Sequence, residues 1–263
     1  DPVKAAWFTN PRFRQALSHA IDRVSIARNV YYGQAEPLYG PIPAVNKAWY
    51  DAGTPKPDAN LDKARRLLAD AGFKDRNGDG IVEDATGHKV GFTILTNSSN
   101  NERKATAAML AEDFKSLGLD VTSSAIDFQA LVQKVTETFD YDAGLLGGTG
   151  GVPPDPVTML NSLRSDGRQH FWWPRQKTPA TRWEASIDSL LDAQMKLPTV
   201  AQRKPLMDQV QKIYAREMPA LFTVSPKRFV AVRNRVKNLR PSIFRPWAVW
   251  NAEELYLEPT TSG

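Results

Sequence analysis

Residues 147–156 form the segment of the sequence best suited to contact a ligand. They read Gly-Gly-Thr-Gly-Gly-Val-Pro-Pro-Asp-Pro and directly follow an apolar stretch expected to be a strand. Ligands of open α/β sheets bind beside the carboxyl ends of the strands, and glycines let a ligand approach the backbone closely. The prolines exclude a dinucleotide-binding turn, and no Gly-Lys-Ser/Thr follows to make a phosphate loop. We expect this segment to contact a ligand, and the alternative is a plain connecting loop. The expected contact residues are Gly148, Thr149, Gly150, Gly151, Val152 and Asp155.

A second candidate segment combines aromatic and basic side chains shortly afterwards. His170, Trp172, Trp173 and Arg175 lie in a polar stretch that also contains a proline. Aromatic rings and guanidinium groups suit a cleft that holds a peptide or a carboxylate. The alternative is that one tryptophan packs internally and the other covers the surface.

An acidic turn upstream resembles the start of a calcium-binding loop. It begins Asp-Arg-Asn-Gly-Asp-Gly-Ile at residue 75, but its twelfth position is Thr86 instead of the bidentate glutamate of an EF-hand. A hairpin-like turn is the alternative, because Asn-Gly and Asp-Gly are strong turn signals. If calcium binds, the expected ligands are Asp75, Asn77, Asp79, the Ile81 carbonyl and Glu83.

The sequence offers little for bond-making chemistry. It has no cysteine and only three histidines, His19, His88 and His170. The histidine spacing fits no zinc motif, and no Gly-x-Ser-x-Gly nucleophile turn is present. We therefore expect a protein that binds without catalysing a reaction and requires no cofactor, and we consider a hydrolase the weakest hypothesis.

Composition narrows the class further. The chain has 263 residues, 41% of them apolar, and 34 basic against 29 acidic side chains, a net charge of +5. Basic residues gather between Met218 and Ala252, where no acid occurs. Clustered cations attract nucleic acid, but no recognition motif accompanies them. We expect a solvated face around a buried strand at residues 229–232, no nucleic-acid partner, and no membrane span, because no apolar run is long enough.

The apolar pattern predicts an α/β fold. Strands expected at residues 89–96, 119–123 and 142–147 alternate with helices expected at 101–117 and 128–139. The order β-α-β-α-β indicates parallel strands joined by crossovers. Further helices are expected at 11–27, at 61–71 and in three segments beyond Pro156. Strands at 221–224, 229–232 and 255–257 are expected to belong to a separate sheet.

Several segments together resemble the family 5 extracellular solute-binding proteins, the peptide-, dipeptide- and nickel-type receptors of ATP-driven importers. Residues 12–23, RFRQALSHAIDR, are similar to that family's "VRQALxxAIDR" helix. Residues 40–43 match its "GPIP" loop, and residues 61–73 match its "KAxxLLAEAGY" helix. Residues 141–156 resemble "FDMxLxGWGxDxxDP". The resemblance extends over about residues 10–258.

The resemblance implies a periplasmic-binding-protein-like lobe with a parallel core, flanking helices and C-terminal strands. Residues 1–218 would form the second lobe, and residues 219–263 would return toward a first lobe whose N-terminal part is not in this sequence. The tryptophan and aspartate of the family's loop correspond to Thr149 and Val152. In peptide-binding members that aspartate pairs with the amino terminus of the ligand, so free-amine recognition is not expected to carry over.

The resemblance also implies a function. Two lobes would close over a peptide-like or similar small solute and deliver it to an importer permease. The protein would work in the periplasm or on the outer face of a bacterial membrane, with its signal sequence outside this chain. Contact with the membrane would be indirect, through the permease or a lipid anchor. A stand-alone interaction or sensor module with the same fold is the alternative.

Overall fold

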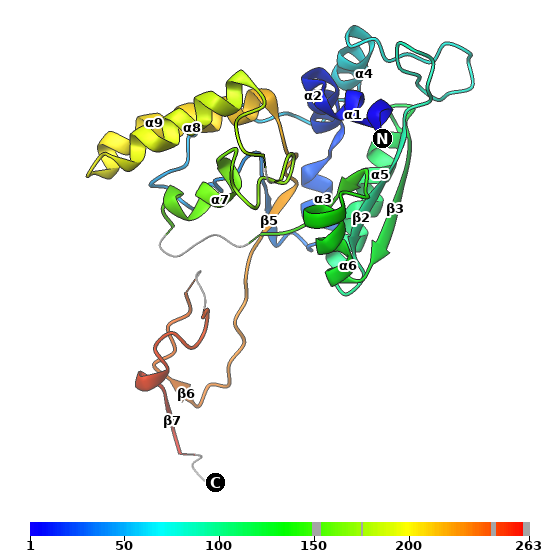
Figure 1. Ribbon diagram of the computed structural model, residues 1–263. Helices are drawn as coiled ribbons and strands as arrows, with labels where there is room; N and C mark the ends of the chain where they lie inside the picture. Colours follow the sequence, from blue (N-terminus) through cyan, green and yellow to red (C-terminus); the bar gives the residue numbers. More distant parts are fainter. Residues whose placement is uncertain (149–153, 175, 243–245, 260–263) are drawn as a thin grey trace.

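A three-stranded parallel sheet organises the first part of the protein (Figure 1). This computed structural model describes residues 1–148, 154–174, 176–242 and 246–259. The spatial order of the strands is β3-β2-β4, and β2 pairs in parallel with both neighbours. The α/β prediction is therefore confirmed, with strands β2 (Gly91–Asn97), β3 (Asp120–Ile126) and β4 (Ala143–Gly144).

The crossover helices form where the sequence places their caps. Helix α5 (Asn101–Lys115) begins after Asn100, whose side chain accepts the backbone N–H of Arg103. It buries Leu110 and Phe114 against the sheet. The predicted helix over 128–139 consists of α6 (Phe128–Gln133) and one π-helical turn (Lys134–Thr138).

Four helices complete the first hydrophobic core. The helix expected at 11–27 is interrupted near Asp22, whose carboxylate caps a new helix by accepting the N–H of Ser25. Another helix, at residues 2–9, precedes the one expected at 11–27 and was not predicted from the sequence pattern. The four helices are α1 (Pro2–Thr9), α2 (Pro11–Ala20), α3 (Arg23–Asn29) and α4 (Leu61–Asp70).

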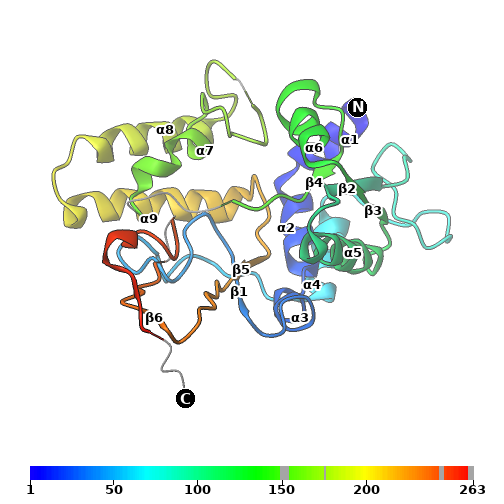
Figure 2. The ribbon, with the colours of Figure 1, turned by 90° about the horizontal axis from the view of Figure 1, so that it is seen from below.

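A second hydrophobic core lies beside the first. Long helices α8 (Arg182–Met195) and α9 (Val200–Glu217) lie side by side, away from the sheet (Figures 1 and 2). They pack with Ile42 and Trp49 from the long segment after α3. A 3-10 turn (Pro156–Met159) and α7 (Leu160–Leu163) join this core, so the three helical segments predicted beyond residue 156 are present.

The C-terminal strands lie outside the parallel sheet, as predicted. Strand β5 (Val224–Pro226) pairs antiparallel with β1 (Ala35–Pro37), and β6 (Val236–Lys237) pairs with β7 (Tyr256–Leu257) after a 3-10 turn (Ala252–Glu254). Because β5 is paired with β1 and the Lys227 N–H donates to the Gln34 carbonyl, the chain stays hydrogen-bonded to the body of the lobe as far as Lys227.

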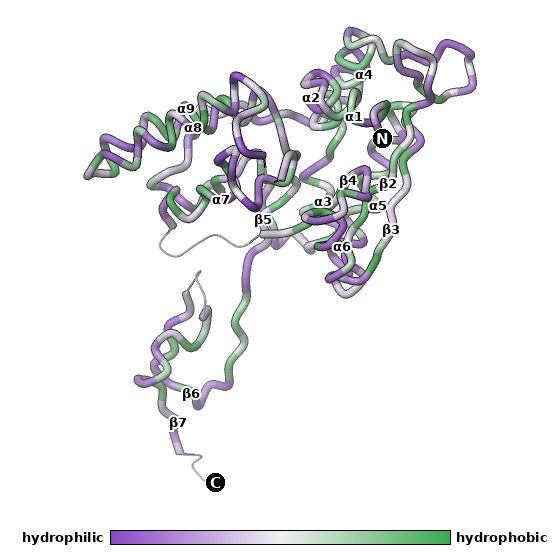
Figure 3. The backbone as a smooth tube through the Cα atoms, viewed as in Figure 1, coloured by the Kyte–Doolittle hydropathy of each residue, from purple (hydrophilic) through white to green (hydrophobic). Residues whose placement is uncertain are grey.

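The buried strand predicted at residues 229–232 is wrong. No strand is assigned to these described residues, and the side chain of Phe229 is 72% exposed. The segment runs extended, with alternating hydrophobic and hydrophilic stretches (Figure 3). An apolar pattern can form a strand only beside a partner strand, and here the described part of the chain supplies none.

Among the described residues, no helix is both long and apolar enough to cross a membrane.

Candidate functional site

Arg103 and Asn97 hold the start of the glycine-rich loop at the carboxyl edge of the sheet. Asn97 ends β2 and Arg103 lies in the first turn of α5. The guanidinium donates one hydrogen bond to Asn97 Oδ1 at 2.9 Å and a longer one to the Gly147 carbonyl at 3.4 Å. A Cβ at Gly147 would lie 2.5 Å from Arg103 Nη2, so glycine is what lets the guanidinium lie against the chain. Gly148 is exposed and has open space beside it.

Sequence reasoning missed Arg103. The signal available was a basic residue in the first turn of a helix that follows a parallel strand, which places it at the edge where ligands of such sheets bind. Among the described residues, no carboxylate lies within ion-pair distance of its guanidinium. Arg103 is partly buried, so its charge is only partly screened by water.

The other end of the loop is fixed by Asp155. Both of its carboxylate oxygens accept hydrogen bonds from Arg203 of α9, at 2.7 and 2.6 Å. These bonds lower the pKa of Asp155. The Arg203 guanidinium also lies over the Trp49 ring at 4.8 Å, and Asn46 donates to the Pro154 carbonyl at 3.0 Å. The charge of Asp155 is thus compensated within the protein.

His170 and Trp172 belong to a buried network and do not form an open cleft. His170 is fully buried, with Nε2 3.1 Å from Glu184 Oε1. Trp172 Nε1 and Gln176 Nε2 donate to the same oxygen, each at 3.1 Å, while Thr181 donates to Oε2. Burial would raise the pKa of Glu184, but these hydrogen bonds outweigh it and the pKa is lowered.

Trp173 remains available at the surface. Its side chain is 54% exposed, whereas Trp172 packs against Trp183 and Tyr214 of the second core. Tyr141 donates to the Phe171 carbonyl at 3.4 Å, which links this segment to the chain just before β4. The two adjacent tryptophans therefore divide between core and surface. The remaining candidates, Thr149, Gly150, Gly151, Val152 and Arg175, lie outside the described residues.

The proposed calcium loop brings three of its carboxylates together. Oxygens of Asp75, Asp79 and Glu83 all lie within 4.8 Å of one another. Lys89 already pairs with Asp79 at 2.5 Å, and this hydrogen bond lowers the pKa of Asp79. Asn77 donates to Glu83 Oε1 at 2.8 Å. A bound cation would have to compete with the Lys89 ammonium.

The remaining two calcium candidates, Asn77 and Ile81, form hydrogen bonds with Asp79 within the loop. The Asn77 side-chain oxygen accepts the N–H of Asp79 at 2.9 Å, while Ile81 is partly buried and donates its own N–H to Asp79. Of the five predicted ligands, the structure thus assembles the three carboxylates as one cluster.

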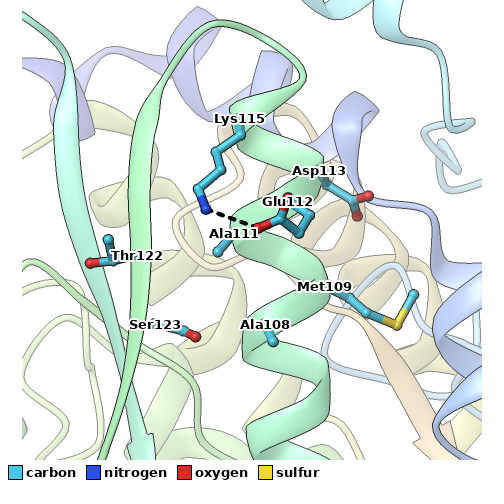
Figure 4. Close-up of a pocket in the computed structure, with 8 residues that line it drawn as sticks. All are labelled: Ala108, Met109, Ala111, Glu112, Asp113, Lys115, Thr122 and Ser123. Carbon is cyan, nitrogen blue, oxygen red and sulfur yellow. Dashed lines mark hydrogen bonds and ion pairs between the residues drawn. The ribbon is translucent and has the colours of Figure 1, made fainter.

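A separate pocket of about 390 Å³ lies between α5 and β3 (Figure 4). It contains none of the predicted site residues. Burial raises the pKa of Asp113 at this pocket to about 6, and the nearby charge of Asp22 contributes. Glu112 and Lys115 form an ion pair across one turn of the helix. The lining residues are Ala108, Met109, Ala111, Glu112, Asp113, Lys115, Thr122 and Ser123.

This parallel α/β lobe has the fold of solved periplasmic solute-binding proteins. The chain belongs to the bacterial extracellular solute-binding proteins, family 5, because the model of that family's middle region matches residues 2–171. The resemblance and the fold class expected from the sequence are thereby confirmed.

Individual relatives agree with this family. The chain is 31% identical over 242 residues to the oligopeptide-binding protein AppA of Bacillus subtilis, covering 89% of this chain and 42% of that protein. It is 34% identical over 244 residues to a probable ABC transporter-binding protein of Deinococcus radiodurans, covering 89% of this chain and 41% of that protein. The chain thus spans less than half the length of these relatives.

Solved structures show the same fold. The structure of AppA from Bacillus subtilis in complex with a nonapeptide superposes with a TM-score of 0.81 at 27% identity, covering 97% of this chain and 49% of that one. The structure of DppA from Helicobacter pylori in complex with the peptide STSA superposes with a TM-score of 0.73 at 22% identity, covering 96% of this chain and 45% of that one.

Proposed function

We propose that this chain is the ligand-binding lobe of an extracytoplasmic receptor that delivers a peptide-like or similar small solute to an ABC importer. Its family consists of solute-binding proteins, and the relatives carry names that describe oligopeptide, nickel and heme binding. The receptor would work by closure of two lobes over the solute, without making or breaking bonds. Its site of action would be the outer face of the membrane, with the importer permease as partner.

The observation that carries the proposal is the position of Arg103, Asn97 and Gly147. They meet where β2 and β4 end, which is where ligands of open parallel sheets bind. Residues 147–155 would approach the solute with their backbone, and the exposed ring of Trp173 would stack on it. Arg103 would attract an anionic group of the solute.

Solute binding by the protein that contains this lobe tests the proposal. Calorimetric titration with short peptides, nickel complexes and heme should find one class that binds with a Kd of about 1 μM or tighter, as expected for a specific small-solute site. Trp173→Ala should weaken that binding. Met195→Ala, which truncates an exposed apolar side chain at the end of α8, should leave it unchanged.

Two outcomes would overturn the proposal. One is the absence of binding for every class of solute tested. The other is an equal loss of affinity in the Trp173 and Met195 variants, because the effect would then not depend on the proposed site.

A further inference from the structure

Helix α2 connects the two hydrophobic cores at the point where the chain crosses between them. The first core contains α1–α5 and the sheet, and the second contains α7–α9. After α9 the chain passes between the cores, since Leu221 and Val224 pack on the first while Phe222 packs on the second. Long polar side chains of α2 and of the first residue of α3 bind backbone carbonyls along this crossing.

Arg14 caps the C-terminal ends of two helices at once. Its Nη1 donates to the Phe8 carbonyl of α1 at 2.7 Å, and its Nη2 donates to the Glu217 carbonyl of α9 at 2.6 Å. Its Nε also bonds the carbonyls of Glu217 and Met218, at 3.1 and 3.0 Å. The last carbonyls of a helix lack intrahelical partners and carry partial negative charge, so a guanidinium satisfies them well.

Met218 shows why this cap is needed. Its φ is 47°, a left-handed conformation that glycine usually adopts at the end of a helix. Pro219 follows directly and cannot continue the helix. Arg14 binds the carbonyls on both sides of this turn, and Gln15 donates to the Arg216 carbonyl at 2.9 Å.

Arg23 fixes the next part of the crossing. Its Nε donates to the Phe222 carbonyl at 2.8 Å and to the Leu38 carbonyl at 3.2 Å, while Nη1 and Nη2 bind the Ser18 carbonyl and hydroxyl at 2.9 Å each. The guanidinium also lies over the Tyr39 ring. Arg23 is 4% exposed, and burial lowers its pKa to about 10, so it stays charged at neutral pH.

We propose that Arg14, Gln15 and Arg23 are positioning residues that hold the two cores in one fixed orientation and thereby align the two ends of the solute loop. One end, Gly147, is held by Arg103 of the first core, and the other, Asp155, is held by Arg203 of the second. A change in the angle between the cores would separate these ends. The part of this inference that concerns solute binding rests on the proposed function.

Distance measurement between the cores tests the inference directly. These 263 residues contain no cysteine, so spin labels can be attached to cysteines placed at Ala105 of α5 and Ala193 of α8, both exposed. Arg14→Met and Arg23→Met should broaden the distance distribution measured by pulsed electron resonance. Arg14→Lys should broaden it less, because lysine keeps the charge but lacks the fork of donors.

Arg65→Met is the matched control. Arg65 of α4 donates to the Ser116 carbonyl at the end of α5 at 2.8 Å, so it also caps a helix, but entirely within the first core. Its loss should leave the distance distribution unchanged. Arg14, Gln15 and Arg23 together are called the clamp. If a methionine variant of Arg14 or Arg23 does not fold, Gln15→Ala tests the clamp by removing only the exposed hydrogen bond to the Arg216 carbonyl, and it should broaden the distribution slightly.

The inference is overturned if every clamp variant keeps the wild-type distribution, whatever happens to its stability. Solute titration provides a second readout, in which the Arg14 and Arg23 variants should bind about tenfold more weakly, equivalent to about 1.4 kcal/mol. If the wild-type protein binds no solute, the proposed function fails, but the distance measurements still decide whether Arg14, Gln15 and Arg23 fix the orientation of the two cores.

Discussion

Arg203 and Asp155 form a two-pronged ion pair that joins helix α9 to the end of the glycine-rich loop. The two bonds measure 2.7 and 2.6 Å, and both side chains are largely shielded from water. A planar guanidinium facing a carboxylate in this way gives geometric specificity as well as energy. Asp155 therefore positions the loop and has no free charge with which to hold the amino terminus of a peptide.

Asp155→Asn should destabilise the protein by about 2 kcal/mol at pH 7, because it leaves the partly buried Arg203 without its counter-ion. The pKa of Asp155 is lowered in the folded state, so its contribution to stability is present above the unfolded value of 3.8 and is lost as the pH falls through the folded pKa. The stabilities of wild type and variant, measured by urea unfolding, should therefore converge as the pH falls below 3.8. Glu112→Gln, which breaks the exposed pair with Lys115, should cost at most about 0.5 kcal/mol. A difference between wild type and Asp155→Asn that does not depend on pH would contradict this account.

Gly147→Ala should lower stability by about 1 kcal/mol, because the new Cβ displaces Arg103 from Asn97 and from the loop carbonyl. Gly148→Ala is a close control for stability, since open space surrounds that position. Thermal unfolding of the two variants measures the difference. Equal melting temperatures would show that Arg103 can move aside without loss.

Truncation of the two adjacent tryptophans should change the stability of the protein by very different amounts. Trp172→Ala removes a packed ring and leaves Glu184 with one donor fewer, so we expect a loss of about 3 kcal/mol. Trp173→Ala removes an exposed ring and should change stability by at most about 0.5 kcal/mol. Chemical denaturation checks both values. Similar losses in the two variants would mean that Trp173 also packs in solution.

Asp113→Asn should stabilise the protein at pH 7.5 but not at pH 4. Burial raises the pKa of Asp113 to about 6, so the folded state holds this proton more tightly than the unfolded state. Its contribution is therefore present below the unfolded value of 3.8 and is lost as the pH rises through about 6. With allowance for solvent screening, the gain at pH 7.5 should be on the order of 1 kcal/mol. Melting curves across this range decide the matter, and a gain already present at pH 4 would disprove the assigned cause.

The affinity of the acidic loop for calcium should depend on Lys89, whose ammonium already pairs with Asp79. If Asp75, Asp79 and Glu83 bind the cation, millimolar calcium should raise the melting temperature, and Lys89→Gln should increase that shift by removing the competing ammonium. Asp79→Asn should abolish it. Titration with calcium, with magnesium as the control, measures the effect. No shift in either the wild type or the Lys89 variant would exclude a calcium ion here.

Local signals were sufficient to predict the parallel core. Alternating apolar residues such as Val90, Phe92 and Ile94 indicated a strand, and the strand is present at Gly91–Asn97. The following helix was expected at 101–117 and is present at Asn101–Lys115, and Gly118 after it adopts a left-handed φ, because such glycines act on their immediate neighbours. The same pattern misled at residues 229–232, since a strand also needs a partner strand.

Distant pairings were not predictable from the sequence. His170 was expected in a cleft that holds a ligand, but its Nε2 lies 3.1 Å from Glu184 Oε1 of a later helix and the imidazole is fully buried. Similarly, Asp155 could have paired with any of 34 basic side chains. Only the packing of α9 beside the loop selects Arg203.

The sequence by itself determined the family, the α/β class and the loop that follows the third parallel strand, because periodicity, caps and turns are properties of neighbouring residues. Tertiary structure decided which charges are free and which are compensated. Arg103 and Gly147 are 44 residues apart in the chain, and Arg14 and Glu217 are 203 apart. The first contact exists because α5 packs on the sheet that contains β4, and the second because the two hydrophobic cores fold against each other and bring the Glu217 carbonyl within reach of Arg14.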